Sequence, residues 1–446
     1  MGRPHALMIP YPAQGHVKPM MALSHRLIEY GIKITLVNTE FNHARVMAAL
    51  HKTGVDQGQI NLVAIPDGLA DNDDRNDLAQ LCDGMYSVMP ACLEELIGKM
   101  KESGEDEITF IIADGSMGWA LEVAEKMGIR RAAFWPAAAA VLATIMNIPD
   151  LIEDGTLDAH GLPTKEEEIH LSPTVKTSLF VWLFIGDPAA QKTLFKFVHR
   201  SSHSIKLAQH IICNSFHDIE PQTFALSPQI LPIGPLDARS DGNFWPQDSS
   251  CLTWLDQQPT SSVIYIAFGS FTVFNPPQFQ ELAHGLELCG RPFLWVVRSD
   301  PTDGSTPPYP DGFLERVADR GLVVGWSPQQ NVLAHPSVAC FITHCGWNST
   351  MEGLVNGVPM LCWPYFADQF LNQVYISDVW KVGLKMDPDG DGIIPRGEIK
   401  KKVEDLLGED GVKARALELK EMAKKNVGEG GTSSEVFKDF VQVIKD

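Results

Sequence analysis

One stretch in the second half of the chain combines residue types and a spacing that suit the binding of an anion. The β-branched run 338–344 leads into a turn at Gly346, and a helix is expected to begin near Asn348. The free N–H groups and the positive dipole end of such a helix point back at the turn and bind phosphate well. His344 and Ser349 add side-chain donors, and the glycine lets a ligand approach the backbone closely. The pattern predicts a phosphate site, although a capped helix with incidental polar residues would look the same.

Carboxylates and an amide at the same expected sheet edge add groups that bind sugars. Glu352 lies one helical turn beyond the phosphate site and could accept hydrogen bonds from a sugar diol. Asp368 and Gln369 follow the next strand, 358–364, and open the next helix. Because the carboxyl ends of parallel strands meet at one edge, these side chains should lie near the phosphate site. Together the residues suit a nucleotide diphosphate sugar.

A histidine and an aspartate in the first half of the chain form a second candidate site. His16 follows the first expected strand, 6–12, and Asp114 ends the strand 109–114 at the same sheet edge. A histidine in that position could act as a general base. From the residues alone, His16 could also be a structural imidazole in a loop, and Asp114 could cap a helix that begins near Ser116.

The elements that must position these residues alternate between strands and helices. Strands are expected at 6–12, 32–39, 61–66, 109–114, 131–135 and 205–215, and again at 262–270, 293–297, 322–326, 338–344 and 358–364. This order predicts α/β units with parallel sheets that are covered on both faces. The Pro- and Gly-rich stretch 232–246 lacks periodicity and is expected to link two doubly wound halves with a ligand cleft between them.

The domain boundaries follow from this linker. We expect an N-terminal domain at 1–240, a C-terminal domain at 241–430, and a final helix at 431–446 that packs back on the N-terminal domain. Residues 70–107 and 150–200 look irregular, charged or aromatic, and are expected to be surface excursions.

The composition excludes several classes of protein. Of 446 residues 44% are hydrophobic, so the chain is not disordered. Lys+Arg 36 against Asp+Glu 56 gives a net charge of −20, which repels nucleic acid and anionic membranes. The start has no signal-peptide layout, and the longest apolar stretch, 132–146, is too short to span a bilayer. The eight cysteines include no C-x-x-C pair and are expected to be free thiols. We therefore expect a cytoplasmic protein, and a monomer.

The 44 residues from 326 to 369 resemble the signature box of plant family-1 UDP-dependent glycosyltransferases. The fixed positions of that box agree throughout: Trp326, Pro328, Gln329, His335, Pro336, His344 to Ser349, Glu352, Gly357, Pro359, Asp368 and Gln369. The segments PYPAQGHVKPMM near the start and IAFGS at 266–270 also fit, so the resemblance covers the whole chain. It implies the GT-B fold, in which two Rossmann-like domains face each other across a cleft. The N-terminal domain would bind the acceptor and the C-terminal domain the UDP-sugar.

The resemblance also assigns each part of the donor to particular residues. It implies that Trp326 stacks under uracil, that Gln329 and Glu352 bind the ribose, that His344, Asn348 and Ser349 hold the diphosphate beside Gly346 and Ser270, and that Trp347, Asp368 and Gln369 bind the sugar hydroxyls. Glutamine at the last position of the box is associated with glucose in the family. The donor substrate would be UDP-glucose, with no further cofactor.

The same resemblance makes His16 the catalytic base and Asp114 the partner that orients it. The base removes the acceptor proton during attack opposite to UDP, so that an α-linked donor gives a β-glycoside. We expect glucosylation of a hydroxyl on a small lipophilic plant metabolite, a flavonoid or other phenol. A terpenoid or sterol alcohol, or a carboxylic acid, is the alternative acceptor. A nucleotide-sugar-binding protein without transferase activity is the alternative of a different class.

The residues that line the acceptor pocket are the least determined part of the site. They should come from the first domain, and five aromatic side chains are candidates, each of which core packing would explain as well: Phe134, Trp135, Phe180, Trp182 and Phe184.

Acidic motifs elsewhere in the chain resemble metal sites. Residues 387–398 match the calcium loop of an EF-hand, but a strand is expected before them and Pro395 lies inside the loop. The D-x-D pairs Asp71/Asp73 and Asp387/Asp389 lie in expected loops away from the nucleotide motif. We therefore expect acidic surface turns and no bound metal.

Overall fold

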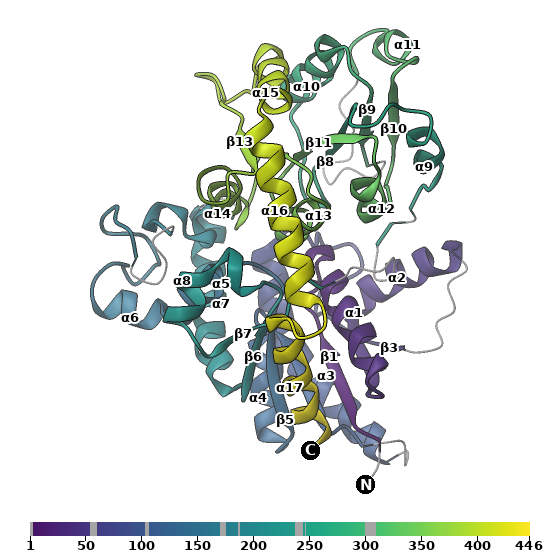
Figure 1. Cartoon of the computed structure of the whole chain (residues 1–446). Helices are drawn as coiled ribbons and strands as arrows, with labels where there is room; N and C mark the ends of the chain where they lie inside the picture. The colour runs from purple at the N-terminus through teal and green to yellow at the C-terminus, as the bar shows by residue number, and fades with distance from the viewer. Residues whose placement is uncertain are drawn as a thin grey trace. The chain divides into compact units, whose positions relative to one another are not determined.

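The chain forms two compact units, each built on its own parallel β-sheet (Figure 1). The computed structural model describes all residues except 1–2, 54–59, 103–106, 170–174, 186–187, 237–243, 246 and 299–308. The first unit comprises Met1–Pro246 and Lys425–Asp446, and the second comprises Gln247–Lys424. These divisions lie a few residues from the expected ones at 240 and 430. Most of the expected linker, 237–243 and 246, lies outside the described residues.

The sheet of the first unit has seven strands in the order β3-β2-β1-β4-β5-β6-β7, and each pair of neighbouring strands is parallel. The strands are β1 (His5–Ile9), β2 (Lys33–Thr39), β3 (Ile60–Ile65), β4 (Phe110–Asp114), β5 (Arg130–Trp135), β6 (His210–Cys213) and β7 (Ile230–Pro232). The strand order runs outward in both directions from the pair β1 and β4. Such a switch point leaves a crevice at the carboxyl ends of the two strands, where open α/β sheets bind ligands.

The sheet of the second unit has six parallel strands in the order β10-β9-β8-β11-β12-β13. They are β8 (Val263–Ala267), β9 (Phe293–Val296), β10 (Gly321–Val324), β11 (Val338–Thr343), β12 (Met360–Cys362) and β13 (Gly383–Lys385). Here the switch point lies between β8 and β11. All residues of β8 and β11 are buried, which explains why both read as continuous apolar runs.

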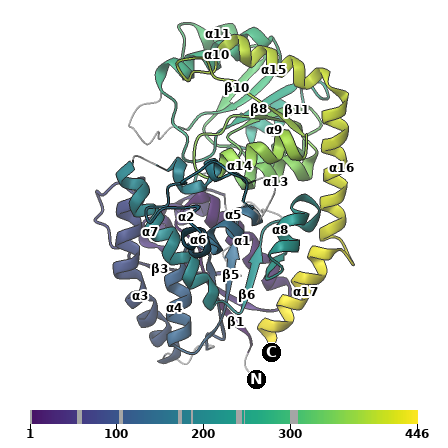
Figure 2. The same ribbon diagram turned by 90° about the vertical axis from the view of Figure 1, so that its left-hand side faces the viewer.

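Helices cover both faces of the first sheet because right-handed crossovers on the two sides of a switch point place their helices on opposite faces. They are α1 (Gln14–Glu29), α2 (Glu40–Thr53), α3 (Leu78–Glu102), α4 (Gly118–Lys126), α5 (Ala139–Met146), α6 (Ile148–Glu153), α7 (Pro188–Ser204), α8 (Pro221–Leu226) and α17 (Thr432–Lys445). Apolar residues of α1 and α17 share one core with β1, β2 and β4. The helices α3, α4 and α7 pack against one another (Figure 2).

Two segments that looked irregular in the sequence are helical, so that expectation was wrong. Residues 78–102 form α3, whose buried positions Leu81, Met85, Met89 and Leu93 recur at intervals of four. Gly84 and Pro90 interrupt this pattern. Residues 188–204 form α7, which buries Ser201, Ser202 and Ser204. Buried serines hide the apolar stripe that normally identifies a helix.

The helices of the second unit are α9 (Ser250–Leu255), α10 (Pro276–Cys289), α11 (Phe313–Arg316), α12 (Gln329–Ala334), α13 (Trp347–Asn356), α14 (Gln369–Val374), α15 (Arg396–Gly408) and most of α16 (Asp410–Val427). One apolar cluster of this unit includes residues of β8, β9, β11, α10 and α15. It fixes the relative positions of the strand ends that carry the candidate donor residues.

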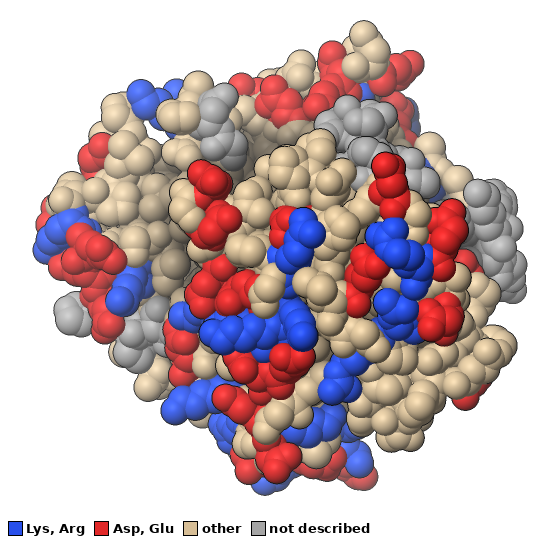
Figure 3. Space-filling view, turned by 90° about the horizontal axis from the view of Figure 1, so that it is seen from above, with Lys and Arg blue, Asp and Glu red and all other residues tan. Residues whose placement is uncertain are grey.

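Acidic and basic side chains are interspersed on the face drawn in Figure 3. The ion pairs of the second unit include Lys402 with Asp387 and Arg316 with Glu287. The excess of negative charge is therefore not gathered into one patch on this face. Among the described helices, none has the length and apolar character needed to cross a membrane.

Candidate active site

The phosphate site expected from the sequence is formed by β11, a tight turn and α13. The strand ends at Thr343, Cys345 adopts a left-handed φ of 64°, and Gly346 precedes the first helical residue. The turn is held by a hydrogen bond from the Cys345 N–H to Thr343 Oγ1 (3.1 Å) and by one from Asn372 Nδ2 to the Cys345 carbonyl (2.9 Å). No side chain caps α13 at Gly346. The turn therefore presents the positive end of a ten-residue helix.

His344 lies between two glycines that make room for its ring. A Cβ atom on Gly269 would lie 2.6 Å from His344 Nε2, and one on Gly346 would lie 2.5 Å from it. Both distances are below any ordinary contact, so neither glycine can gain a side chain unless the ring moves. Burial lowers the pKa of His344 to about 4, and the positive charge of Arg298 adds to this effect. The imidazole is neutral at physiological pH and can act as a hydrogen-bond donor, not as a cation.

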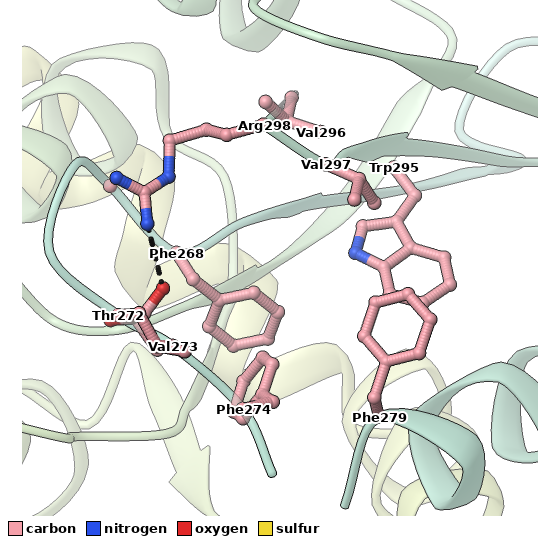
Figure 4. A pocket seen from close by; sticks show the side chains of 10 residues that line it. Phe268, Thr272, Val273, Phe274, Phe279, Trp295, Val296, Val297 and Arg298 are labelled. Carbon is pink, nitrogen blue, oxygen red and sulfur yellow. Dashed lines mark hydrogen bonds between the residues drawn. The ribbon is translucent and has the colours of Figure 1, made fainter. Parts of the chain in front are cut away.

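Arg298, which follows β9, holds the loop that follows β8. Its guanidinium donates to the carbonyl of Ser270 and to the carbonyl of Thr272, the latter at 3.1 Å (Figure 4). Aromatic side chains, among them Phe268 and Trp295, line a small cavity of about 60 Å³ beside it. The sequence pattern did not indicate this arginine, because it lies outside the signature box at 326–369. The sheet-edge rule that selected the other residues would have found it, since β9 is the neighbour of β8.

The residues expected to bind ribose form one hydrogen-bonded group. Gln329, the first residue of α12, donates from Nε2 to Ser349 Oγ and to Glu352 Oε2, both at 2.8 Å. Its carbonyl oxygen Oε1 accepts from the hydroxyl of Tyr265 at 3.1 Å. Ser349 and Glu352 are 7% and 5% exposed. The structure thus brings Gln329 next to Ser349 and Glu352, which lie 20 and 23 residues further along the chain on α13.

The residues expected to bind the sugar, Trp347, Asp368 and Gln369, are positioned by hydrogen bonds and packing with neighbouring residues of the second unit. Gln369 Oε1 accepts from the backbone N–H groups of Tyr365 (2.8 Å) and Phe366 (3.0 Å), so only its NH2 group could donate to a sugar. Asp368 accepts from Asn372 Nδ2 at 2.8 Å through one carboxylate oxygen. The ring of Trp347 is buried and packs against Trp380 with the ring centroids 6.2 Å apart. A contact of Trp347 with a sugar would therefore come from its backbone, not from its indole.

Trp326, expected to stack under uracil, lies in the turn between β10 and α12, where its carbonyl accepts from the N–H of Asp248 at 2.8 Å. This bond ties the turn to the segment that precedes α9. The indole itself keeps its assignment to uracil as a prediction.

In the first unit, His16 and Asp114 meet at the switch point between β1 and β4. Ile9 of β1 is in register with Ala113 of β4, which places the two chain segments side by side. His16 Nδ1 lies 2.7 Å from Asp114 Oδ2, and Asp114 is fully buried whereas the His16 side chain is 27% exposed. The other carboxylate oxygen accepts from the Ser116 N–H at 2.8 Å. Asp114 therefore stabilises the turn before α4, as a local cap would, and orients His16 at the same time.

This arrangement fixes what His16 can do chemically. A carboxylate can only accept, so the proton of a neutral His16 lies on Nδ1 and the lone pair on Nε2. The ring can then take a proton at Nε2, and the imidazolium that forms is stabilised by Asp114. The geometry is that of a histidine general base with an orienting carboxylate.

Aromatic side chains around His16 come from the end of the first expected strand and from two helices in segments that were expected to be irregular. The ring of Tyr11 lies 5.0 Å from that of His16, Phe197 of α7 contacts Tyr11, and Tyr86 of α3 contacts Phe197 at 5.4 Å. Burial and the neighbouring Cys82 raise the pKa of Tyr11 well above its ordinary value, so its hydroxyl stays protonated.

Most of the aromatic residues proposed to line the acceptor pocket belong to the core. The four that are buried are Phe134, Trp135, Phe180 and Trp182. The indole of Trp182 stacks on Phe180 and donates to the Gly161 carbonyl at 2.7 Å, and that of Trp135 donates to the Ala138 carbonyl. Only Phe184 is partly exposed. The alternative of core packing therefore holds for these four residues.

The acidic motifs form surface turns. Asp389 accepts from the N–H groups of Asp391 and Ile393, and Asp387 pairs with Lys402 at 2.9 Å. The loop follows β13, not a helix, so it is not an EF-hand. Asp73 accepts from the Ala70 N–H in a local turn. Within the described part of the chain, no three His, Cys, Asp or Glu side chains are grouped to hold a metal ion. All eight cysteines are free.

Similarity to known proteins agrees with this geometry. A family model described as UDP-glucoronosyl and UDP-glucosyl transferase matches residues 191–388. The chain is 45% identical to UDP-glycosyltransferase 83A1 of Arabidopsis thaliana, over 100% of this chain and 97% of that protein. It is 35% identical to 7-deoxyloganetin glucosyltransferase of Gardenia jasminoides, over 99% of this chain and 97% of that protein. The structure of Phytolacca americana UGT2 complexed with UDP-2fluoro-glucose and pterostilbene matches with a TM-score of 0.81 at 28% identity and covers 99% of each chain.

The chain therefore belongs to the UDP-dependent glycosyltransferase family. It is a glycosyltransferase with the GT-B fold, and its two parallel-sheet units are the two Rossmann-like domains of that fold. The family and fold predicted from the signature box are confirmed. The roles of individual site residues remain predictions.

Proposed function

We propose that this enzyme transfers glucose from UDP-glucose, with inversion, to a hydroxyl group of a small lipophilic acceptor such as a flavonoid or other phenol. The observation that carries the proposal is the pair of His16 and Asp114, joined at 2.7 Å at the switch point of the first unit. Neighbouring proteins support the donor, since one is named a glucosyltransferase and another was solved with UDP-2fluoro-glucose.

The reaction begins with the acceptor hydroxyl next to His16 Nε2. A neutral hydroxyl is a weak nucleophile, so removal of its proton during attack lowers the barrier. The oxygen attacks the anomeric carbon on the side opposite to UDP, the bond to the diphosphate breaks, and the α-linked donor becomes a β-glucoside. Asp114 stabilises the imidazolium until the proton leaves.

The second unit stabilises the departing UDP. The uncapped start of α13, the neutral His344 donor, and the side chains of Asn348 and Ser349 are suited to the diphosphate. Arg298 supplies a full positive charge next to His344. This set of donors can meet the charge of the leaving group without a divalent ion, so we propose that the reaction needs no metal and no other cofactor.

The environment of His16 favours an aromatic acceptor. Tyr11, Phe197 and Tyr86 form a chain of edge-to-face and tilted ring contacts that starts at the base. A planar phenol could extend such packing, in which each aromatic pair contributes roughly 0.5–1.5 kcal/mol. The similar proteins name different compounds, 7-deoxyloganetin and pterostilbene, so a terpenoid or sterol alcohol is the second candidate.

A release assay tests the function and separates it from pure nucleotide-sugar binding. The enzyme is incubated with UDP-glucose and with a panel of phenols, terpenoid alcohols and carboxylic acids, and UDP and glucoside are measured by mass spectrometry. We expect acceptor-dependent UDP release that is largest with phenols and at least tenfold lower with UDP-galactose. Binding of UDP-glucose without acceptor-dependent release would favour a non-catalytic binding protein.

The cellular compartment and the oligomeric state of the enzyme are also part of the proposal. Eight free cysteines agree with a reducing compartment such as the cytoplasm, and we propose that the enzyme acts there as a monomer.

A further inference from the structure

A tyrosine outside the signature box lies directly behind the residues expected to bind ribose. Tyr265 is in the middle of β8 and is fully buried. Its ring stacks on Phe341 of the adjacent strand β11, with the centroids 4.9 Å apart and the planes 23° apart. The stacking leaves the ring little freedom, so the position of the hydroxyl group is set by the sheet.

The hydroxyl of Tyr265 is bonded on two sides. It lies 2.8 Å from Ser327 Oγ and 3.1 Å from Gln329 Oε1. On its far side, Gln329 donates to Ser349 Oγ and to Glu352 Oε2 at 2.8 Å each. Five side chains on β8, α12, α13 and the turn before α12 thus form one continuous network in the second unit.

The chemistry of the network fixes the direction of each hydrogen bond. An ionised carboxylate only accepts, so the NH2 group of Gln329 must face Glu352. The carbonyl of the Gln329 amide then faces Tyr265, which must donate to it, and Ser327 donates to the tyrosine oxygen. Burial raises the pKa of Tyr265 well above its ordinary value, so the hydroxyl keeps its proton.

We propose that Tyr265 is a positioning residue for nucleotide recognition: its hydroxyl holds the Gln329 amide in the one orientation that lets Gln329 and Glu352 bind the vicinal hydroxyls of a ribose. The inference rests on the proposed function, in which these two side chains bind the ribose of UDP-glucose. Both hydrogens of the Gln329 NH2 group are donated within the network, so the hydroxyls of a diol would donate to the Glu352 carboxylate and to the remaining lone pair of Gln329 Oε1. Without the tyrosine hydroxyl, the partly buried side-chain carbonyl of Gln329 loses its donor and the amide can rotate away from Glu352.

The variant Tyr265→Phe tests this role because it removes one oxygen and keeps the stacked ring. Binding is measured by isothermal titration calorimetry with UDP and with 2′,3′-dideoxy-UDP, which lacks both ribose hydroxyls. In the wild type UDP should bind at least tenfold more tightly than the dideoxy compound. In Tyr265→Phe this preference should fall about five- to tenfold, the range expected for one buried hydrogen bond. The affinity for 2′,3′-dideoxy-UDP should change less than about twofold.

The variant Tyr309→Phe is the matched control. Tyr309 packs among Phe279, Trp295 and Phe313 in the core of the same unit, so it tests the loss of a tyrosine hydroxyl elsewhere in that unit. It should leave the preference for UDP unchanged. A second variant, Ser327→Ala, removes the donor to Tyr265 but keeps the bond to Gln329, and it should lower the preference by less than Tyr265→Phe does.

The outcomes separate the positioning role of Tyr265, the recognition of ribose by the network, and the transferase function. An equal loss for both nucleotides in Tyr265→Phe, or no loss, overturns the positioning role, because a purely structural tyrosine would act on both compounds alike. If the wild type binds UDP but does not prefer it over the dideoxy compound, ribose recognition by this network is wrong while the transferase function stands. If the wild type binds neither compound, the proposed function fails as well.

Discussion

The candidate catalytic site of the first unit and the candidate donor site of the second unit differ in how many side chains they join. In the first unit, one partly exposed histidine and one buried aspartate, 98 residues apart in the chain, form the whole candidate pair. In the second unit, the side chains of Tyr265, Ser327, Gln329, Ser349 and Glu352 are joined to one another by hydrogen bonds. A general base must take a proton from acceptor substrates of different shapes. A nucleotide site must bind one ligand of constant shape. The difference suggests that turnover depends on few atoms and donor affinity on many.

The same difference explains which site the sequence reveals. The donor residues follow successive strands within 44 positions, so their types and spacing form a readable pattern. His16 and Asp114 were predictable as well, because each follows a strand at the carboxyl edge of a parallel sheet. The fold was predictable from the βαβ rhythm, since buried parallel strands are continuous apolar runs.

What the sequence did not reveal depends on long-range packing. Tyr265 looks like an ordinary strand residue, and only the register of β8 beside β11 brings its hydroxyl to Gln329. Arg298 follows a strand that carries no motif. Phe197 and Tyr86, which continue the aromatic contacts that begin at His16 and Tyr11, lie on α7 and α3, in segments that were expected to be irregular. Aromatic residues that were proposed for the pocket are instead core, which composition cannot distinguish.

The largest expected effect is the loss of the base. His16→Ala should lower the turnover of a weakly acidic alcohol by about 10²–10⁴-fold, the usual contribution of general-base catalysis. UDP affinity should change less than twofold, because no donor residue is altered. Steady-state rates and calorimetry with UDP measure the two quantities.

Acceptor acidity provides the control for this variant. A thiol or a strongly acidic phenol ionises without help and should recover part of the lost rate, whereas an aliphatic alcohol should not. Near-normal turnover of the alcohol by His16→Ala would rule out this mechanism even though the family assignment stands.

Asp114→Asn tests whether the two residues act as one unit. Asparagine has one carbonyl oxygen, so it cannot accept from both His16 Nδ1 and the Ser116 N–H as the carboxylate does. The variant should lose as much turnover as His16→Ala, or less. The double variant should be hardly slower than His16→Ala alone, because groups that act together are not additive. Multiplied losses in the double variant would mean that the residues act independently.

The pH dependence of the free energy of unfolding tests the burial of His344 in the donor site. The pKa of His344 is lowered from 6.5 to about 4 in the folded protein, so the unfolded state binds the proton first. Stability should therefore fall as the pH decreases from 6.5 toward 4, by about 2 kcal/mol between pH 7 and pH 5 from this group. His344→Asn should reduce that loss, measured as the change in Tm between the two pH values. The exposed His160 is a matched control, and His160→Asn should leave the pH dependence unchanged.

Gly346→Ala tests whether the donor site tolerates any displacement. The φ of Gly346 is −59°, which alanine adopts without strain, so the effect comes from the contact with His344 Nε2. We expect UDP affinity to fall about tenfold while the turnover of bound donor changes less, because the ring shifts within the phosphate site. Gly325→Ala, where an added Cβ would meet no atom within 4 Å, should bind UDP normally. If the two variants bind UDP equally well, His344 does not contact the diphosphate.

The smallest expected effect is that of metal removal. Transferases that rely on a divalent ion use it to neutralise the diphosphate, and here Arg298, the His344 N–H and the start of α13 are available for that task. After dialysis against EDTA the rate should stay within about twofold of the untreated enzyme, and Mn²⁺ or Ca²⁺ should add nothing. The charge of the diphosphate would then be neutralised by groups of the protein alone. For the same reason, Arg298→Gln should weaken the binding of UDP more than the binding of uridine, which has no diphosphate. Loss of activity with EDTA and recovery with Mn²⁺ would instead make the acidic turns at Asp71 and Asp387 the first places to search for a metal.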